Sequence, residues 1–476
     1  MQVMRVDVAV IGGGTAGLGA RRAVVEAGKS AVLIEGGPWG TTCARVGCMP
    51  SKLLIAAAEA AHAVRAAPHF GIQVPDGVRV DGRAVLRRVQ AERDRFVGFV
   101  LDGVEAIPPE QRLRGHARFV APTTLQVDDH TRVEARAVVI ATGSTPKIPP
   151  SLAAVWDAVL TNENAFELAD LPESIAVVGT GVIGLEVGQA LHRLGVRTTL
   201  FARRDLLGPL TDPVVRASVS AAMAAELDIH CNASIAVQRD GGGFLVRWTD
   251  TAGGRGERRV AAILSSAGRT PNLADLGLEH TGLALDAQGV PTIDTHTMQC
   301  GDAPIFLAGD VSNYRPVLHE AADEGRIAGS NAARFPEVRA QHRRVPLLIA
   351  FTEPNLAMVG ARFSELRQGE HEVGCVDYGD QGRARVMRQN AGMVRVYATR
   401  ECGTLIGAEM FGPRVEHTAH LLAWAVQAGL TVEETLDMPF YHPVVEEGIR
   451  TALRDLSTRL KLRGPLRSLE ECGPGS

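Results

Sequence analysis

Apolar runs that end in glycine recur along this chain and predict its secondary structure. Residues 5–11 form a short run rich in valine, and a glycine cluster, a helical stretch over 16–27 and a second apolar run at 30–34 follow it. A short apolar run bounded by glycine is typical of a buried strand, so this pattern predicts a strand–helix–strand unit. The same order of segments returns at residues 174–201. We therefore predict an α/β protein that contains two such units.

The segments between and after these units predict the rest of the organisation. A helical region extends over residues 51–106, with an interruption at 68–81, and residues 112–135 alternate with turns as hairpin strands do. Further strands are expected at 137–140, 261–266 and 305–308. From about residue 341 the chain changes to β-rich segments followed by helices, which indicates a separate C-terminal α+β domain.

Composition narrows the class of protein. The chain has 476 residues and a formal net charge of −4, so neither nucleic acid nor an anionic membrane is expected as a partner. Its start runs straight into a strand without the apolar core and cleavage site of a signal peptide. No apolar run reaches the roughly 18 residues of a membrane span. We therefore expect a soluble, cytoplasmic protein.

The first glycine cluster has the spacing G-x-G-x-x-G, with Gly12, Gly14 and Gly17. The first glycine permits a tight turn, the second lets the backbone approach a pyrophosphate, and the third allows close packing of helix on strand. Glu35 closes the following strand, where a carboxylate can bind a ribose 2′-hydroxyl. The motif therefore indicates a dinucleotide site, against the alternative of a tight turn in an ordinary α/β domain.

A second cluster with the same spacing allows two sites to be compared within one chain. Its glycines are Gly179, Gly181 and Gly184. The residue that corresponds to Glu35 in this second copy is Ala202, which Arg203 and Arg204 follow. A carboxylate would repel the 2′-phosphate of NADPH, whereas arginine pairs with it. The second site is therefore predicted to prefer NADPH over NADH; the alternative is that the two arginines belong to a solvated loop.

Cys43 and Cys48 are the only neighbouring pair among the seven cysteines. Their C-x4-C spacing fits about one helical turn, so the two sulfurs can meet, and Pro50 suits the start of a helix. The N-terminus of a helix lowers the pKa of a nearby thiol and favours the reactive thiolate. In a reducing compartment such a pair is redox-active or binds metal. No metal site is predicted, because zinc would need two further ligands that no second close Cys/His pair supplies.

In this order, the motifs resemble those of the class I pyridine nucleotide–disulfide oxidoreductases, the family of dihydrolipoamide dehydrogenase, glutathione reductase and mercuric reductase. The resemblance covers nearly the whole chain, with further motifs at residues 141–144 (ATGS), 267–272 (AGRTPN), 308–310 (AGD), 351–354 (FTEP) and 442–447 (HPVVEE). It implies an α/β fold with two Rossmann-like dinucleotide-binding domains and a C-terminal α+β dimerisation domain. The implied boundaries are residues 1–147 with 271–340 for FAD, 148–270 for NAD(P)H and 341–476 for dimerisation.

The resemblance also assigns cofactor contacts residue by residue. For FAD it implies Gly12, Gly14, Gly17, Glu35, Thr42, Lys52, Ala117, Thr142, Gly143, Arg269 and Asp310, with Asp310 on the ribityl chain. For NAD(P)H it implies Gly179, Gly181, Gly184, Arg203, Arg204 and Gly268.

The same resemblance implies the residues that carry the electrons. Cys48 would be the charge-transfer cysteine that faces the flavin, and Cys43 would be the interchange thiol that meets the substrate. Lys52 would pair with Glu186 beside the flavin N5 atom, where hydride arrives.

His442 is expected to move the proton that thiol chemistry requires. It precedes Pro443, and Glu447 lies five positions further on, where its carboxylate can orient the ring. A thiol couple needs a proton acceptor near neutral pH, which histidine provides. In the family this histidine comes from the partner subunit, so the resemblance implies a homodimer. The alternative is a histidine with a purely structural role.

Some features depart from the family or point in different directions. Only one glycine precedes Thr41 and Thr42, where the family usually has two. The Ser-Lys pair at 51–52 is closer to dihydrolipoamide dehydrogenase and mercuric reductase, whereas the arginines at 203–204 favour NADPH-linked reductases. The substrate stays open between a lipoyl domain, glutathione disulfide and another small thiol. Mercuric reductase is disfavoured, because an N-terminal metal-binding module and a C-terminal cysteine pair are missing.

The sequence thus predicts an enzyme, a flavin-dependent oxidoreductase that moves electrons between a nicotinamide nucleotide and an external dithiol or disulfide through Cys43 and Cys48. Its redox motif is closest to dihydrolipoamide dehydrogenase, and the alternative is an NADPH-dependent reductase of a small disulfide such as glutathione disulfide. A redox sensor without turnover and a structural subunit of a multienzyme complex are further alternatives. Cys472 near the C-terminus is a lone thiol that cannot form a second redox pair within one chain.

Overall fold

The computed structural model describes residues 1–74, 77–251 and 253–462. The chain divides into two compact units, one of residues 1–172 with 264–343 and the other of residues 173–263 with 344 onward. Both units combine helices and sheets, so the predicted α/β class is confirmed. The three-domain division at the boundaries given above stays a prediction. Within the described residues, no helix has both the length and the apolar character of a membrane span.

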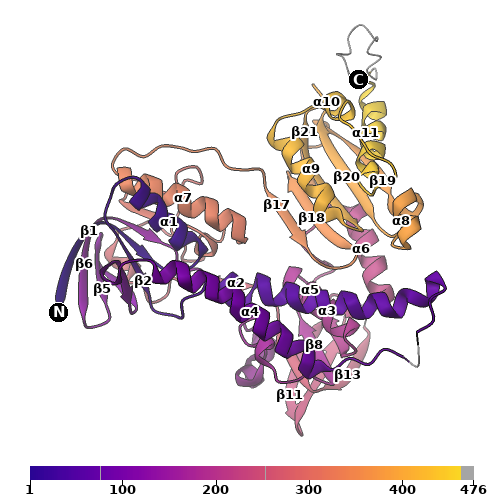
Figure 1. Ribbon diagram of the computed structural model, residues 1–476, viewed down its shortest axis with the longest axis horizontal. Helices are drawn as coiled ribbons and strands as arrows, with labels where there is room; N and C mark the ends of the chain where they lie inside the picture. The colour runs from indigo at the N-terminus through magenta and orange to yellow at the C-terminus, as the bar shows by residue number, and fades with distance from the viewer. Residues whose placement is uncertain (75–76, 252, 463–476) are drawn as a thin grey trace. The chain divides into compact units, whose positions relative to one another are not determined.

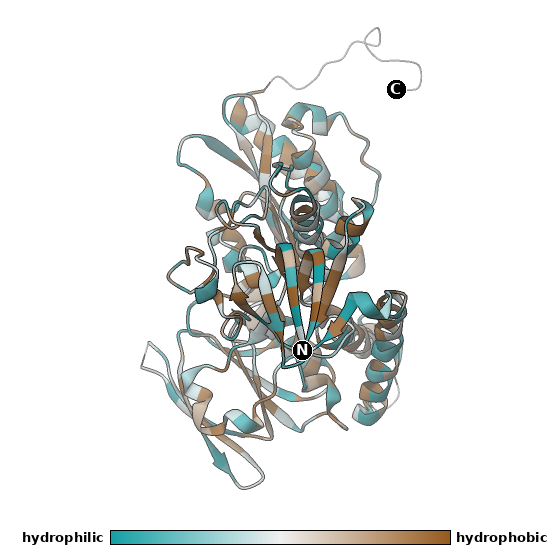
Figure 2. Cartoon of the chain, turned by 90° about the vertical axis from the view of Figure 1, so that its left-hand side faces the viewer, coloured by the Kyte–Doolittle hydropathy of each residue, from teal (hydrophilic) through white to brown (hydrophobic). Residues whose placement is uncertain are grey.

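The first unit is built on a seven-stranded sheet. Its strands are β3 (Arg112–Arg114), β2 (Ala31–Glu35), β1 (Gln2–Ile11), β6 (Thr131–Ile140), β5 (Thr124–Val127) and β4 (Ala117–Ala121) in spatial order, with β16 (Ile305–Leu307) also paired to β6. The pairs of β1 with β2 and β6, of β2 with β3 and of β6 with β16 are parallel, whereas β4, β5 and β6 form the expected antiparallel hairpins. Hydrophilic and hydrophobic bands alternate on the strands around the N mark in Figure 2, and the last four residues of β1 are buried.

Helices α1 (Thr15–Glu26) and α7 (Leu318–Arg334) are far apart in the sequence but lie side by side in this unit (Figure 1). Small residues bring their backbones together. A Cβ on Gly325 would overlap the backbone of Ala16, and one on Gly329 would overlap the backbone of Ala20. Because closely packed interiors leave no room for an added methyl group, these positions fix one helix against the other.

The helical region predicted over residues 51–106 consists of α3 (Cys48–Ala66) and α4 (Gly82–Glu105), with the expected interruption between them, and the short helix α2 (Thr42–Val46) precedes it. Two short strands, β7 (Ser144–Pro146) and β15 (Arg269–Pro271), pair antiparallel. This strand pair brings the motifs at residues 141–144 and 267–272 into contact.

The second unit contains the second strand–helix–strand repeat. One sheet has the order β10 (Asp228–His230), β9 (Arg197–Phe201), β8 (Ser174–Val178) and β14 (Ala262–Ser265), and the helices are α5 (Val182–Arg193) and α6 (Pro213–Glu226). A separate antiparallel sheet consists of β11 (Ser234–Asp240), β12 (Gly243–Thr249) and β13 (Arg255–Val260). All residues of β8 are buried, as in parallel strands covered on both faces. The predicted repeat at residues 174–201 is confirmed.

The C-terminal part of this unit has the α+β character that the change of pattern near residue 341 predicted. Its antiparallel sheet has the order β17 (Leu347–Ala350), β18 (Asn355–Gly360), β21 (Leu405–Gly412), β20 (Met393–Thr399) and β19 (His371–Asp377), and its helices are α8 (Gly382–Met387), α9 (Val415–Gln427), α10 (Val432–Leu436) and α11 (Glu447–Leu460). The sheet, α9 and α11 enclose one core of buried aliphatic side chains around Tyr378.

Candidate functional site

The first glycine fingerprint forms the turn between β1 and α1. A Cβ on Gly12 would overlap the carbonyl of Ala141, and one on Gly17 would overlap the carbonyl of Gly12, so glycine alone permits this approach of strand and helix. Gly14 instead faces open space, since nothing lies within 4 Å of its Cβ position. Gly14 is also the N-cap of α1, which has no side-chain cap and no acidic residue in its first turn. The positive end of α1 is therefore open to an anion such as a pyrophosphate.

Glu35 is fixed beside this turn. Its Oε2 accepts the Gly13 N–H at 2.7 Å, and its Oε1 accepts the Gly37 N–H at 2.6 Å. An ionised carboxylate can accept about four hydrogen bonds, so each oxygen keeps a lone pair for a ligand. This arrangement suits the ribose contact expected of Glu35.

The second fingerprint has matching properties. Gly181 is the N-cap of α5, no side chain caps this helix, and its first turn carries no acidic residue. Nothing lies within 4 Å of the Cβ position of Gly181. Arg203 and Arg204 follow β9 and are both exposed. Because β8 and β9 are parallel neighbours, the fingerprint and the two guanidiniums lie at the same edge of the sheet. A second phosphorylated ligand can therefore approach this edge.

Cys43 and Cys48 lie on two consecutive helices, the five-residue α2 and the 19-residue α3. Cys43 is the second residue of α2 and Cys48 is the first of α3, and Gly47 between them has a non-helical backbone with φ −123° and ψ −110°. The expected single helical turn is therefore wrong, because the chain breaks at Gly47. The two side chains still meet, since the Cys43 thiol and the Cys48 side chain are hydrogen-bonded. Both cysteines are partly buried.

The surroundings of Cys43 disfavour the thiolate form of its side chain. The pKa of Cys43 is raised by the hydrogen bond with Cys48 and by burial, while the charge of Lys52 acts in the opposite direction. The expected lowering of this pKa by a helix N-terminus is therefore wrong for Cys43. The reason is that Cys48, not Cys43, is the first residue of α3, while the hydrogen bond with Cys48 and burial raise the pKa of Cys43. Release of the Cys43 thiolate consequently needs a base.

Thr41 has a backbone conformation that is almost reserved for glycine. The backbone of Thr41 has a φ of 59° and a ψ of 149°, and a residue other than glycine in this conformation is strained by on the order of 1–3 kcal/mol. The side chain offsets part of this cost, because Oγ1 accepts the Ala44 N–H at 3.3 Å as the N-cap of α2. Threonine at a position where the family usually has glycine thus strains the chain directly before Cys43.

We expect the variant Thr41→Gly to unfold at a higher temperature than the variant Thr41→Ala. Both variants lack the capping hydroxyl, but only glycine adopts this backbone without strain. The difference should be about 1 kcal/mol in the free energy of unfolding, because the greater entropy of the unfolded glycine chain offsets part of the relieved strain. Thermal melts of the two holoproteins, followed by circular dichroism, measure this difference. Equal melting temperatures would show that Thr41 is not strained.

A chain of hydrogen bonds joins the segment 43–48, which carries the two cysteines, to two predicted FAD contacts, Arg269 and Asp310. The Nδ2 of Asn162, a buried residue, donates to the carbonyl of Val46 at 2.9 Å, and its Oδ1 accepts from Nη1 of Arg269 at 3.0 Å. Arg269 Nε donates to Ser144 Oγ at 2.8 Å, and Ser144 Oγ donates to Asp310 Oδ2 at 3.1 Å. Sequence reasoning assigned no role to Asn162 or Ser144. Membership of the ATGS motif was a usable signal for Ser144, whereas nothing in the local pattern marks Asn162.

The remaining predicted cofactor contacts lie at the ends of secondary-structure elements. Thr142 and Gly143 follow β6, and Gly143 has a φ of +68°. Thr42 begins α2, and Ala117 begins β4 and is buried. Gly268, expected to contact NAD(P)H, belongs to the first unit and faces open space with a φ of +103°. These placements leave the assigned roles as predictions.

Lys52 belongs to the first unit and Glu186 to the second, and each contacts a residue of its own unit. The Nζ of Lys52 on α3 lies 3.5 Å from Oγ of Ser51. Glu186 on α5 is almost fully buried, and its Oε1 accepts the backbone N–H of Phe351 at 2.8 Å. The expected ion pair between Lys52 and Glu186 stays a prediction.

His442 and Glu447 form the contact that their spacing suggested. Nδ1 of His442 lies 3.0 Å from both oxygens of Glu447, the first residue of α11. A carboxylate only accepts hydrogen bonds, so Nδ1 carries the proton and Nε2 is the basic nitrogen of the neutral ring. The side chain of His442 is 78% exposed, so this nitrogen can be reached from outside its own chain.

Comparison with known proteins identifies the class. Residues 6–325 match the pyridine nucleotide-disulphide oxidoreductase family, and residues 347–453 match its dimerisation domain. The mercuric reductase of Streptomyces lividans is 32% identical over 441 residues, covering 90% of this chain and 91% of that protein. The dihydrolipoyl dehydrogenase of Bacillus subtilis is 28% identical over 461 residues, covering 94% of this chain and 97% of that protein. The crystal structure of LpdA from Mycobacterium tuberculosis matches with a TM-score of 0.81 and 26% identity, over 95% of this chain and 99% of that one.

This chain therefore belongs to the pyridine nucleotide-disulphide oxidoreductase family, as its motifs indicated. It is an FAD-dependent oxidoreductase of the disulfide class, and its dimerisation domain supports a homodimer. The relatives include both mercuric reductases and dihydrolipoyl dehydrogenases, so they leave the substrate unresolved. They give no support to setting mercuric reductase aside. Cys472, the lone C-terminal thiol, lies outside the described residues.

Proposed function

We propose that this enzyme moves two electrons between NADPH and an external dithiol or disulfide, in the manner of dihydrolipoamide dehydrogenase. The contact between Cys43 and Cys48 carries the proposal, because two adjacent thiols can exchange with a substrate disulfide and re-form their own. The same segment is linked through Asn162 and Arg269 toward Asp310. FAD, when bound, supplies the step that connects a two-electron nicotinamide donor to the cysteine pair.

The open end of α1 and the carboxylate of Glu35 would hold the FAD pyrophosphate and ribose, with Asp310 on the ribityl chain. The open end of α5 would hold the pyrophosphate of the nicotinamide nucleotide. Each site offers backbone N–H groups at a helix N-terminus, which favours a negatively charged ligand. The two sites differ at the end of the second strand, where one has a carboxylate and the other has two arginines.

The cysteines would carry the sulfur chemistry. The Cys43 thiolate attacks one sulfur of the substrate disulfide and expels the other as a thiolate, which leaves a mixed disulfide. The Cys48 thiolate then attacks the Cys43 sulfur, releases the second substrate thiolate and forms the Cys43–Cys48 bond. Two electrons have passed to the substrate, whose two thiolates take up the two protons. Oxidation of a substrate dithiol runs the same steps in reverse.

His442 would move the proton at the Cys43 sulfur. The raised pKa of Cys43 means that this thiol does not ionise readily by itself. Nε2 of His442 is the basic nitrogen because Glu447 holds Nδ1. In the proposed homodimer, His442 of the partner subunit serves each cysteine pair, which agrees with the exposure of this ring in a single chain.

We expect the double variant Arg203→Ala, Arg204→Ala to raise the KM for NADPH by about 10- to 100-fold. Loss of charge-assisted hydrogen bonds to the 2′-phosphate would weaken NADPH by this amount, whereas NADH has no such group. The KM for NADH should therefore change by less than about 3-fold. Arg197→Ala is the matched control, because Arg197 is an exposed arginine at the opposite end of β9. A wild-type enzyme that strongly prefers NADH would contradict this assignment.

The substrate is tested by steady-state kinetics with lipoamide, glutathione disulfide and mercuric ion, each with NADPH and NADH. The proposal expects the highest kcat/KM with lipoamide. A preference for glutathione disulfide would favour a reductase of small disulfides, and a preference for mercuric ion would favour the reaction named for the Streptomyces lividans relative. Reduction of the bound flavin by NADPH without turnover of any substrate would favour a redox sensor. Activity only together with a co-purifying lipoyl protein would favour a subunit of a multienzyme complex.

A further inference from the structure

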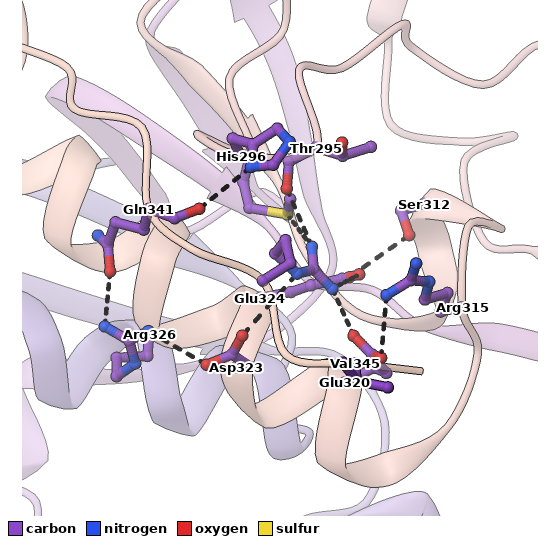
Figure 3. A network of polar contacts seen from close by, with 12 residues as sticks. Thr295, His296, Ser312, Arg315, Glu320, Asp323, Glu324, Arg326, Gln341 and Val345 are labelled. Carbon is purple, nitrogen blue, oxygen red and sulfur yellow. Dashed lines mark hydrogen bonds and ion pairs between the residues drawn. The ribbon is translucent and has the colours of Figure 1, made fainter. Parts of the chain in front are cut away.

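Three buried carboxylates share one face of α7. Glu320, Asp323 and Glu324 are each at most 5% exposed. Figure 3 shows their carboxylates pointing from the helix toward a common region. Buried negative charges on neighbouring helical turns repel one another and lose hydration, so their burial requires positive partners.

Arg343 supplies the central positive charge. Its Nη2 lies 2.5 Å from Oε2 of Glu320 and 3.0 Å from Oε1 of Glu324, and its Nε lies 3.8 Å from Oδ2 of Asp323. Arg343 is itself buried, and its Nη1 donates to the carbonyl of Thr295 at 3.1 Å. Burial raises the pKa of the Glu324 carboxyl, and the hydrogen bond from Arg343 opposes that rise. Arg343 therefore favours the ionised form of Glu324.

Two outer arginines pair with the other two acids. Nη1 of Arg315 lies 3.3 Å from Oε1 of Glu320, and Nη2 of Arg326 lies 3.1 Å from Oδ1 of Asp323. The second oxygen of each of these acids thus faces a side-chain cation (Figure 3).

The second oxygen of Glu324 is used differently. Its Oε2 accepts the backbone N–H of Gly309 at 2.8 Å and lies 3.5 Å from Oγ of Ser312. Gly309 has a φ of +81°, and a Cβ at this position would lie 2.9 Å from the Cβ of Ala16 on α1. The next residue is Asp310. Glu324 and α1 therefore hold the backbone from which the Asp310 side chain extends.

We propose that Glu324 is a positioning residue for FAD, which fixes the Gly309 backbone so that Asp310 meets the flavin, and that Arg343 in turn fixes Glu324. The inference rests on the role proposed above for Asp310. A buried ion cluster adds little net stability compared with apolar packing, so stability alone does not account for this arrangement. The hydrogen bond from the Gly309 N–H to Glu324 instead connects the ion cluster to the turn before Asp310, so the cluster can fix the position of Asp310.

The matched variants Glu324→Ala and Glu320→Ala test this role. Both remove a buried carboxylate that contacts Arg343 from the same helix, but only Glu324 also contacts the backbone of Gly309. The measurement is the Kd of FAD for each apoprotein, from flavin fluorescence, together with the flavin content of each purified holoprotein. We expect Glu324→Ala to bind FAD at least about 10-fold more weakly than Glu320→Ala, because a buried N–H loses its acceptor. Glu324→Gln, which keeps an acceptor oxygen, should recover most of the affinity.

Equal FAD affinities for the two alanine variants would overturn the inference, as would a Glu324→Gln variant no better than Glu324→Ala. If Glu324→Ala does not fold, the isosteric pair Glu324→Gln and Glu320→Gln decides. A residual loss of FAD affinity of about 2- to 3-fold in Glu324→Gln but not in Glu320→Gln supports the role, because an amide is a weaker acceptor than a carboxylate, and equal binding in the two contradicts it. A wild-type protein that binds no FAD would instead contradict the proposed function, so the two failures are distinguishable.

Discussion

Replacement of Cys43 by serine should lower turnover of any disulfide substrate by at least about 1,000-fold, while the protein keeps its FAD. A serine hydroxyl is not a nucleophile near neutral pH without strong activation, and it cannot form a disulfide with Cys48. The groups proposed to hold FAD are the glycine turn, Glu35 and Asp310, so removal of the Cys43 sulfur leaves them intact. Steady-state turnover and the visible flavin absorbance of the purified variant are measured together.

The matched control is Cys231→Ser. Cys231 is also a partly buried free cysteine, but it lies in the second unit and away from the redox helices in sequence. This variant should keep nearly normal turnover. Normal turnover in Cys43→Ser would refute the proposed mechanism, and loss of FAD from Cys43→Ser would show that the residue has a structural role at the flavin.

The variant His442→Ala should slow thiol–disulfide exchange by roughly 100- to 10,000-fold, the usual contribution of a positioned general base. The raised pKa of Cys43 explains why this base matters, because the thiol holds its proton. Stopped-flow kinetics can separate the two half-reactions. Reduction by NADPH should be nearly unchanged, whereas exchange with the substrate should be slow and should lose the acid limb of its pH–rate profile. Added imidazole should restore part of the rate.

The variant His417→Ala provides the control for His442. His417 is an exposed histidine that, like His442, belongs to the C-terminal α+β part of the second unit. Its Nε2 lies 3.5 Å from Oε1 of Glu416, so it also belongs to a histidine–carboxylate pair. Its loss should leave both half-reactions close to those of the wild type. An equal effect of the two substitutions, or a slow reduction by NADPH in His442→Ala, would contradict the assigned role.

The features that the sequence predicted correctly are those with a local cause. The spacing of Gly12, Gly14 and Gly17 demands a tight turn between strand and helix, and the structure has that turn with Gly14 open to a ligand. Alternation in the region after α4 predicted the hairpins, and the five-residue spacing of His442 and Glu447 predicted their contact. In each case a few neighbouring residues determine the geometry.

The features that the sequence did not predict depend on distant parts of the chain or on backbone detail. Asn162 meets Val46 across more than a hundred residues, and no local pattern marks it. The break at Gly47 divides the redox segment into two helices, which C-x4-C spacing alone does not reveal. The pKa direction of Cys43 was missed because the prediction considered only the N-terminus of the helix that Pro50 starts, and not the burial of Cys43 or its hydrogen bond with Cys48.

The contact of α1 with α7 has a consequence for synthesis of the protein. Helix α1 is made from residues near the N-terminus, whereas its partner helix begins only at Leu318, after the strands β8 to β13 of the other unit. A nascent chain that ends before residue 305 lacks both strand β16 and helix α7, and it exposes the small residues of α1. Native contacts between such distant segments form slowly, and incomplete domains expose surfaces that aggregate. The first unit therefore cannot close until residues of the second have already left the ribosome.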